Sequence, residues 1–187
     1  FSRNENINLE YLPYRVEEAN FDKFIKDFFS DKLAKGLNIT LPHKKRAAKI
    51  EGNISSEAKY INAVNTINNK DNELFLFSTD GIGFINDIDN KGFSLEDKKI
   101  LIIGAGAAIE SIMYRVAKSS PKEISIINRT EEKADRLIRK FSNMTTIKSD
   151  LNNKAIYDLV INGSSAGLTG DFEPMENLSA NTKTFFY

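Results

Sequence analysis

A glycine turn between an apolar run and an amphipathic segment constrains this chain more than any other feature. Residues 99–103 are Lys-Ile-Leu-Ile-Ile, a short apolar run typical of a strand buried on both faces. Gly104-Ala105-Gly106 follows directly, and apolar residues then recur at helical spacing, at Ile109, Ile112, Met113 and Val116. A second apolar run at 123–127 completes a strand, turn, helix, strand order. This order predicts two parallel strands joined by a right-handed helical crossover.

The rest of the second half continues the alternation of strands and helices. Ala134, Leu137, Ile138 and Phe141 give a predicted helix over residues 131–141 one apolar face. Further short strands are predicted at 145–147, 157–161 and 184–187. Because alternating strands and helices favour a parallel sheet, we expect an α/β fold in which residues 91–187 form a Rossmann-type dinucleotide-binding domain.

The first half has shorter and less regular elements. Five apolar residues at helical spacing predict a helix over residues 21–30. The other predicted elements are a strand-like stretch at 11–16, a strand at 36–41, a helix from Pro42 that Gly52 ends, strands at 63–68 and 73–77 across a longer turn, and a helix after 79–81. We expect residues 1–90 to form an α/β substrate-binding and catalytic domain. Both ends interrupt these patterns, so we also expect a segment before Phe1 and another after Tyr187.

Composition excludes several classes of function. The 26 basic and 26 acidic residues balance, so no basic surplus favours nucleic acid or anionic lipid. The chain has no cysteine and one histidine, which excludes disulfides, thiol nucleophiles and cysteine- or histidine-based zinc sites. No apolar run approaches the roughly 18 residues that cross a bilayer. We therefore expect a cytoplasmic monomer or homodimer with a small-molecule substrate, no metal, and no nucleic-acid or membrane partner.

The glycine turn has the residue types that a pyrophosphate needs. Gly104 permits the tight turn, and Gly106 lets a phosphate approach the backbone at the positive end of the following helix. Ala107 and Ala108 are small enough for close packing of this helix on the sheet. A glycine turn that only shapes the chain is the alternative. The agreement of strand, turn and helix favours nucleotide binding at residues 104–108.

The end of the second strand distinguishes the two nicotinamide dinucleotides. An NAD site needs Asp or Glu there to bond the ribose 2′-hydroxyl. Asn128 stands 24 residues after Gly104 instead, followed by Arg129 and Thr130. A carboxylate would repel a 2′-phosphate, whereas Arg129 can bind it bidentately and Asn128 and Thr130 can donate hydrogen bonds. These residues predict NADP as the cofactor. Thr130 is also expected to cap the helix that follows.

Three segments of the first half lack an obvious structural purpose: Asn38-Ile39-Thr40-Leu41-Pro42-His43-Lys44, Ala63-Val64-Asn65-Thr66 and Ser78-Thr79-Asp80-Gly81. With the glycine turn and Asn128-Arg129-Thr130 in the same order, the chain resembles the shikimate dehydrogenase family over nearly its whole length. The resemblance implies NADP-dependent reduction of 3-dehydroshikimate to shikimate, an oxidoreductase step of chorismate and aromatic amino-acid biosynthesis.

The resemblance also implies a role for each matching residue. Lys44 corresponds to the catalytic lysine and Asp80 to the aspartate beside it, and both contact the hydroxyl that is oxidised or formed. Thr40 and Asn65 correspond to residues that hydrogen-bond the substrate's hydroxyls. His43 is expected to be incidental and exposed. Read without the family, Lys44 alone predicts only a solvated helix lysine and Asp80 alone only a turn or cap residue.

Some residues depart from the family pattern. Ala107 stands where the family has glycine, Glu110 where arginine is common near the cofactor, and Gly163 where alanine is usual, so we expect weaker cofactor binding. Two alternatives remain open. One is a quinate/shikimate dehydrogenase of broader specificity, against which Asn128 and Arg129 argue. The other is a non-catalytic NADP-binding module, against which the Lys44 and Asp80 pair argues.

Overall fold

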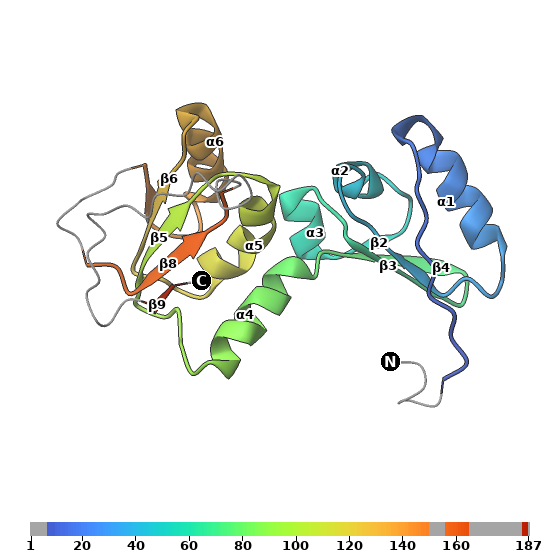
Figure 1. Cartoon of the computed structure of the whole chain (residues 1–187), viewed down its shortest axis with the longest axis horizontal. Coiled ribbons are helices and arrows are strands. Elements are labelled where there is room, and N and C mark those ends of the chain that lie inside the picture. The colour runs from blue at the N-terminus through green and yellow to red at the C-terminus, as the bar shows by residue number, and fades with distance from the viewer. Residues whose placement is uncertain (1–6, 150–155, 165–184, 187) are drawn as a thin grey trace.

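The chain folds into two lobes that meet through helices. The computed structural model describes residues 7–149, 156–164, 185 and 186. Figure 1 shows one lobe in blue to green and the other in yellow to red, with α3, α4 and α5 between the two sheets. Among the described residues, no helix is long and apolar enough to cross a membrane.

The first lobe is built on a mixed four-stranded sheet in the order β1-β3-β4-β2. β3 pairs antiparallel with both β1 and β4, whereas β2 runs parallel to β4. Phe21, Ile25, Val64 and Leu76 belong to its buried core. Its elements are η1 (Glu18–Asn20), α1 (Phe21–Ser30), β1 (Gly36–Asn38), α2 (Lys44–Ala47), β2 (Asn53–Ile54), α3 (Ser56–Ile61), β3 (Thr66–Lys70) and β4 (Glu73–Phe77).

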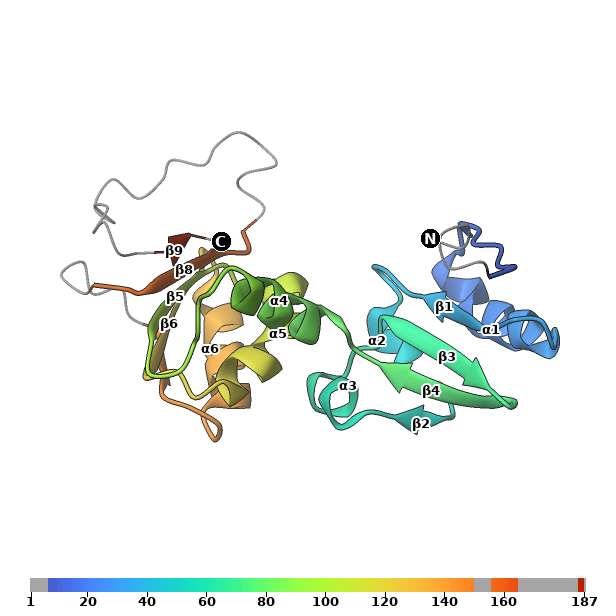
Figure 2. The same ribbon diagram turned by 90° about the horizontal axis from the view of Figure 1, so that it is seen from below.

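The second lobe confirms the predicted parallel sheet. Its strands β5 (Lys99–Ile103), β6 (Glu123–Ile127), β7 (Ile147–Lys148), β8 (Leu159–Asn162) and β9 (Phe185–Phe186) run parallel in the order β7-β6-β5-β8-β9. The three central residues of β5 are fully buried, as a strand covered on both faces requires. Helices α5 (Ala107–Lys118) and α6 (Glu131–Phe141) lie on one face of the sheet (Figure 2). The carboxyl ends of β5 and β6 therefore present the glycine turn and Asn128 at one edge.

Helix α4 (Asp80–Asn90) joins the lobes, because its apolar face packs with the second lobe. Phe84 and Ile88 share one buried cluster with Met113 of α5 and Ile61 of α3. The hydrophobic core of the second lobe thus continues into elements that precede residue 90.

The structure corrects the predicted hairpin turn. We expected a longer turn before residue 73, but β3 continues to Lys70 and only Asp71 and Asn72 connect it to β4. Both residues have positive φ, 54° and 65°. Two left-handed residues make a tight turn whose twist matches the flanking strands, and Asp and Asn adopt this conformation more readily than other non-glycine residues.

Other short elements differ from the prediction as well. The helix expected to continue to residue 51 is α2, only four residues long, and the stretch 11–16 forms no strand. Tyr14 of that stretch instead packs its ring on Phe24 and Phe28 of α1. β2 and α3 were not predicted from the sequence. The signal for α3 was present, because the Ser55 side chain accepts a hydrogen bond from the Ala58 amide and thereby caps the helix.

Candidate active site

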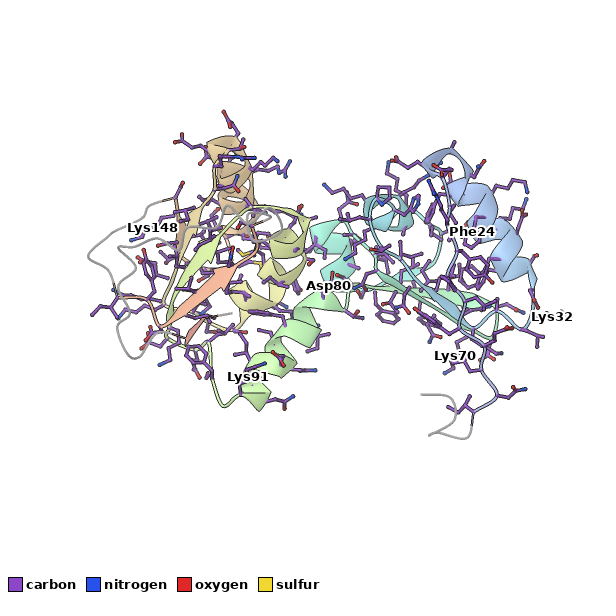
Figure 3. The ribbon with its side chains drawn as sticks, in the orientation of Figure 1. Phe24, Lys32, Lys70, Asp80, Lys91 and Lys148 are labelled. Carbon is purple, nitrogen blue, oxygen red and sulfur yellow. The ribbon has the colours of Figure 1, made fainter. Side chains whose placement is uncertain are left out.

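Lys44 and Asp80 meet, as the sequence predicted for a catalytic pair. Lys44 Nζ donates to Asp80 Oδ2 at 2.8 Å, and their side chains are 24% and 33% exposed. Lys44 begins α2 and Asp80 begins α4, so the helix N-terminus stabilises the carboxylate. Figure 3 labels Asp80 at the junction of the two lobes. An ammonium group carries three hydrogens, and Lys44 Nζ gives only one of them to an acceptor within the described residues.

Asn65 fixes the orientation of the aspartate. Its Nδ2 donates to Asp80 Oδ1 at 2.7 Å, so both carboxylate oxygens have partners. Its Oδ1 accepts from the hydroxyl of Thr66 and from the amide and hydroxyl of Thr79, at 2.9–3.1 Å. These bonds leave one Asn65 N–H for a ligand and no free acceptor. Asn65 is buried, so the lysine, aspartate and asparagine form one preorganised cluster.

Thr40 lies apart from this hydrogen-bonded cluster. It is exposed, and its backbone carbonyl accepts from the amide of His43. Thr40 lies just before α2, and no hydrogen bond joins its side chain to Lys44, Asp80 or Asn65. An exposed hydroxyl close in sequence to Lys44 is suited to a bound ligand.

Several polar residues near the cluster had no role assigned from the sequence. Asn38 Nδ2 donates to Thr66 Oγ1 at 3.4 Å, and the Tyr11 hydroxyl donates to Asn38 Oδ1 at 2.9 Å. Together with Thr79, these residues extend the network from Asp80 to the surface. Asn38, Thr66 and Thr79 lie within the three motifs that carried the resemblance, which was the available signal. Nothing in the sequence marked Tyr11.

His43 is not exposed, contrary to the expectation. Its ring stacks on Phe21 with centroids 4.7 Å apart, and Nε2 is 2.8 Å from the carbonyl oxygen of Val16. The ring is half-buried and turned towards α1 rather than towards Asp80. Its ring packs against α1 through Phe21, so the predicted exposure of His43 is wrong.

Gly81 brings this cluster against the second lobe. A Cβ at residue 81 would lie 2.5 Å from Glu57 Oε1, 2.8 Å from Arg115 Cγ and 3.3 Å from the carbonyl oxygen of Ser111. Because Gly81 follows Asp80 directly, the start of α4 contacts α5 at van der Waals distance. The packing between the lobes therefore requires glycine at position 81.

The glycine turn packs closely against Gly163, the residue that follows β8. Gly104 has φ +104°, and a Cβ there would lie 2.9 Å from the backbone carbon and oxygen of Gly163. A Cβ on Gly163 would in turn lie 2.4 Å from Ile109 Cδ1. The close helix–sheet packing therefore rests on Gly104, Gly163 and Ile109.

Ala107 and Ala108 do not supply this packing, because both are exposed. Their positions suit a ligand instead. They open α5, where backbone N–H groups lack helical partners, and Gly106 before them has nothing within 4 Å of its Cβ position. Open space at a helix N-terminus fits a pyrophosphate. Ala105 is buried, and its amide donates to Asn128 Oδ1 at 3.1 Å.

The three residues of the loop after β6 have different roles. Asn128 Oδ1 holds the Ala105 amide, and Asn128 Nδ2 donates to the carbonyl oxygen of Thr130 at 2.7 Å. Asn128 thus ties the loop to the glycine turn and has one N–H left. Thr130 stands at the N-cap of α6, but its side chain makes no cap hydrogen bond, so the expected side-chain cap is wrong. Arg129 is exposed, and the exposed Arg129 and Thr130 side chains suit a phosphate.

Glu110 is tied to cations of both lobes. Its Oε1 accepts from Lys140 Nζ at 2.9 Å, and its Oε2 lies 4.0 Å from Lys45 Nζ. The carboxylate is therefore paired within the protein, which reduces the repulsion that an acidic residue in the first turn of α5 would exert on a dinucleotide.

Comparison with known proteins gives one consistent result. A family model described as the shikimate dehydrogenase substrate binding domain matches residues 1–67, and a model described as shikimate / quinate 5-dehydrogenase matches residues 87–169. The shikimate dehydrogenase (NADP(+)) of Saccharophagus degradans is 36% identical over 186 residues, covering 94% of this chain and 66% of the relative. That of Hahella chejuensis is 35% identical over 190 residues, covering 100% and 70%. The chain thus spans about two thirds of the length of these relatives.

Solved structures give the same result. An Ael1 enzyme from Pseudomonas putida superposes with a TM-score of 0.82 at 30% identity, over 94% of this chain and 65% of that one. A shikimate dehydrogenase in complex with NADP+ superposes with a TM-score of 0.80 at 29% identity, over 92% and 63%.

Proposed function

Because the chain belongs to the shikimate dehydrogenase family, we propose that its protein catalyses the reversible NADP-linked reduction of 3-dehydroshikimate to shikimate, a step of aromatic amino-acid biosynthesis. The observation that carries the proposal is the Lys44, Asp80 and Asn65 cluster. The packing of Gly81 on α5 holds this cluster against the helix that follows the glycine turn. Substrate-side and nucleotide-side residues thus lie on elements in direct contact.

The residues of the cluster have distinct tasks. Lys44 Nζ exchanges a proton with the substrate hydroxyl whose carbon changes oxidation state. Asp80 holds the ammonium group through Oδ2, and Asn65 holds Asp80 through Oδ1. Asn65, with its remaining N–H, and Thr40, with its exposed hydroxyl, donate to other substrate oxygens. NADP, when bound, supplies the hydride chemistry that no side chain can perform.

The second lobe fits the dinucleotide. The amides of residues 106–108 and the open face of Gly106 receive the pyrophosphate at the start of α5, because the Gly104 and Ala105 amides already donate to Ile127 and Asn128. Arg129 and Thr130 bind the 2′-phosphate, and Asn128 holds the turn and the loop together. Ala107 is exposed where the family has glycine, so its methyl group faces the space that a ligand would enter.

The test of the reaction is the replacement of Lys44. In the full-length protein, Lys44→Ala should lower kcat for shikimate oxidation by about 10²–10⁴-fold, because it removes the proton-transfer group. The dissociation constant for NADPH should not change. Lys49, an exposed lysine five positions after Lys44, provides the matched control Lys49→Ala. Turnover of Lys44→Ala equal to that of the wild type would exclude the assigned role.

The test of the cofactor is the replacement of Arg129. Arg129→Ala should weaken NADP binding roughly tenfold to a hundredfold, the loss expected for charge-assisted hydrogen bonds, and leave NAD binding almost unchanged. Arg136→Ala, an exposed arginine of α6, is the control. Equal losses for NADP and NAD would contradict the 2′-phosphate role and favour the broader quinate/shikimate alternative.

We also propose that the substrate-binding domain ends near residue 90 and the NADP-binding domain begins at 91. The end of α4 at Asn90 and the start of the parallel sheet at Lys99 support this division, although α4 packs on α5. A cytoplasmic location and a monomeric or homodimeric state remain predictions.

A further inference from the structure

Lys140 connects three helices at the junction of the lobes. Its Nζ donates to Glu110 Oε1 of α5 at 2.9 Å and to the carbonyl oxygen of Ile61 of α3 at 3.0 Å. The two side chains of the ion pair are only 25% and 15% exposed, so water screens the pair less than a surface pair. Ile61 is the last residue of α3, where a cation is favoured by the helix dipole.

The contacts around Lys140 seat the end of α3 on the second lobe. The Tyr60 hydroxyl donates to the carbonyl oxygen of Lys140 at 2.6 Å, and the Tyr60 ring packs on Tyr114 and Phe141 at centroid distances of 5.3 and 5.5 Å. Ile61 itself is buried in the core of the second lobe. Apolar contacts thus hold α3 in place, and Lys140 fixes the carbonyl group at its end.

The chain that leaves Ile61 supports both members of the catalytic pair. Asn62 adopts a left-handed conformation and turns the chain out of α3. The Val64 amide then donates to the Lys44 carbonyl oxygen at 2.9 Å, and Asn65 Nδ2 donates to Asp80 Oδ1 at 2.7 Å. A shift of the Ile61 carbonyl group would move a segment that contacts Lys44 and Asp80 within four residues.

Glu110 also approaches α2, the helix that Lys44 begins. Its Oε2 lies 4.0 Å from Nζ of Lys45, the residue after Lys44 in α2. Lys45 is largely exposed, so this contact alone is weak. The stronger contact is with Lys140, which makes Glu110 the link between α6, the first turns of α5 and α2.

We propose that Lys140 and Glu110 are positioning residues that set the place of Lys44 and Asp80 relative to the nucleotide-binding helix. The inference rests on the proposed function. Neither residue contacts Lys44 or Asp80 directly; they act through the Ile61–Asn65 segment and through Lys45. A further ion pair between the lobes, Arg115 with Glu57, lies at the start of α3, and among the described residues neither of its side chains has a hydrogen bond or ion pair to that segment or to α2.

The decisive experiment measures the distance between the lobes without reference to activity. Because the chain has no cysteine, Lys70→Cys on β3 and Asp135→Cys on α6 accept two spin labels selectively, and both sites are exposed. With Lys140 in place, the distances between the two labels should form a single narrow distribution. In Lys140→Met this distribution should become broader. Lys133→Met, an exposed lysine of the same helix, should leave the distribution unchanged. An unchanged distribution in Lys140→Met would overturn the proposal.

Kinetics of the full-length protein supply the second readout. Lys140→Met should lower kcat with shikimate about tenfold or more, since small misplacements of reacting groups are costly, while the dissociation constant for NADP stays constant. Lys140→Arg, which can still donate to both acceptors, should restore most of kcat. A broader distance distribution with unchanged kcat would reduce Lys140 to a purely structural residue and refute its positioning role.

A second variant keeps the test valid if Lys140→Met does not fold. Glu110→Gln removes the ion pair but leaves the bond from Lys140 to Ile61. It should therefore broaden the distance distribution and lower kcat, each by less than Lys140→Met does. If wild-type protein fails to oxidise shikimate, the proposed function fails. The distance distributions then still decide whether Lys140 fixes the lobes.

Discussion

At the scale of single residues, three side-chain identities around the glycine turn depend on one another. Gly104 needs its positive φ and leaves no room for a Cβ beside Gly163. Gly163 leaves no room for a Cβ beside Ile109, which fills the space between α5 and β8. Gly163, which departs from the usual alanine of the family, is therefore matched by the bulk of Ile109.

Replacement of Gly163 should show this dependence. Gly163→Ala should lower the free energy of unfolding by about 1–3 kcal/mol, because its methyl group would meet the Ile109 side chain at 2.4 Å. Ile109→Ala should cost less in the Gly163→Ala background than in the wild type. Urea denaturation of the four proteins gives the coupling energy, expected at about 0.5–3 kcal/mol.

Gly106→Ala is the matched control for stability. Its φ of −85° suits alanine and its Cβ position is open, so the free energy of unfolding should change by less than about 0.5 kcal/mol. Additive effects of the changes at 163 and 109 would contradict the packing argument.

Sequence reasoning identified the residues of the site better than their contacts. The pairing of Lys44 with Asp80 was expected from the motifs, whereas the bond from Asn65 to Asp80 was not. The hydrogen bond from the Ala105 amide to Asn128 Oδ1 could not be predicted, because the two residues lie on different loops. Ala107 and Ala108 were expected to pack the helix on the sheet because they are small, but both are exposed.

At the scale of elements, length decided which predictions succeeded. In the part of the chain that the structure describes, the four helices of ten or more residues, α1, α4, α5 and α6, were all expected, because several turns give a clear apolar period. α2 and α3 have four and six residues, too few for a period to appear. Their positions depend on tertiary contacts. For α2 one such contact is the bond from Arg46 to α1.

This contact between α1 and α2 predicts a pH dependence. Arg46 donates to both carboxylate oxygens of Asp22, at 2.9 and 2.7 Å. Hydrogen bonding and charge from Arg46 hold the pKa of Asp22 below its ordinary value of 3.8. A lowered pKa in the folded state means that the stabilisation is present above the pKa of the unfolded chain. It is lost as the pH falls through the pKa of the folded protein.

Arg46→Met should raise the pKa of Asp22 and remove this acid-dependent stabilisation. Carboxyl-resolved NMR titration measures the change directly. Lys49→Met is the control, since Lys49 acts on Asp22 only through a weaker, longer-range attraction. An Asp22 pKa unaffected by the loss of Arg46 would show that this ion pair does not form in solution.

At the scale of the whole molecule, the sequence predicted two α/β halves but not how they are joined. The connecting pairs are far apart in the chain: Ile61 and Lys140 are 79 positions apart in sequence, and Glu57 and Arg115 are 58 positions apart. No local pattern marks such partners. A helix was expected after residues 79–81, yet only the fold shows that its Phe84 and Ile88 pack with the second lobe.

The Glu57–Arg115 pair gives the last prediction, which concerns how firmly the lobes are joined. Glu57 is 4% exposed in its side chain, its Oε2 accepts from Arg115 Nε at 2.6 Å, and its Oε1 is buried without a hydrogen-bond partner among the described residues. Arg115→Met would leave a buried carboxylate without compensation. Loss of one partner of a fully buried pair costs about 3–5 kcal/mol. Arg115 is 40% exposed, so water moderates the loss, and we expect about 2–3 kcal/mol.

The matching double variant separates charge from packing. Glu57→Gln combined with Arg115→Met removes the buried charge together with its partner, so it should be more stable than Arg115→Met alone in urea denaturation. This order follows because an orphaned carboxylate costs more than an absent ion pair. If the double variant were instead the less stable of the two, the carboxylate would have to gain its stabilisation from a group other than Arg115. The contact of α3 with α5 would then depend on the apolar packing of Tyr60 and Ile61 rather than on this ion pair.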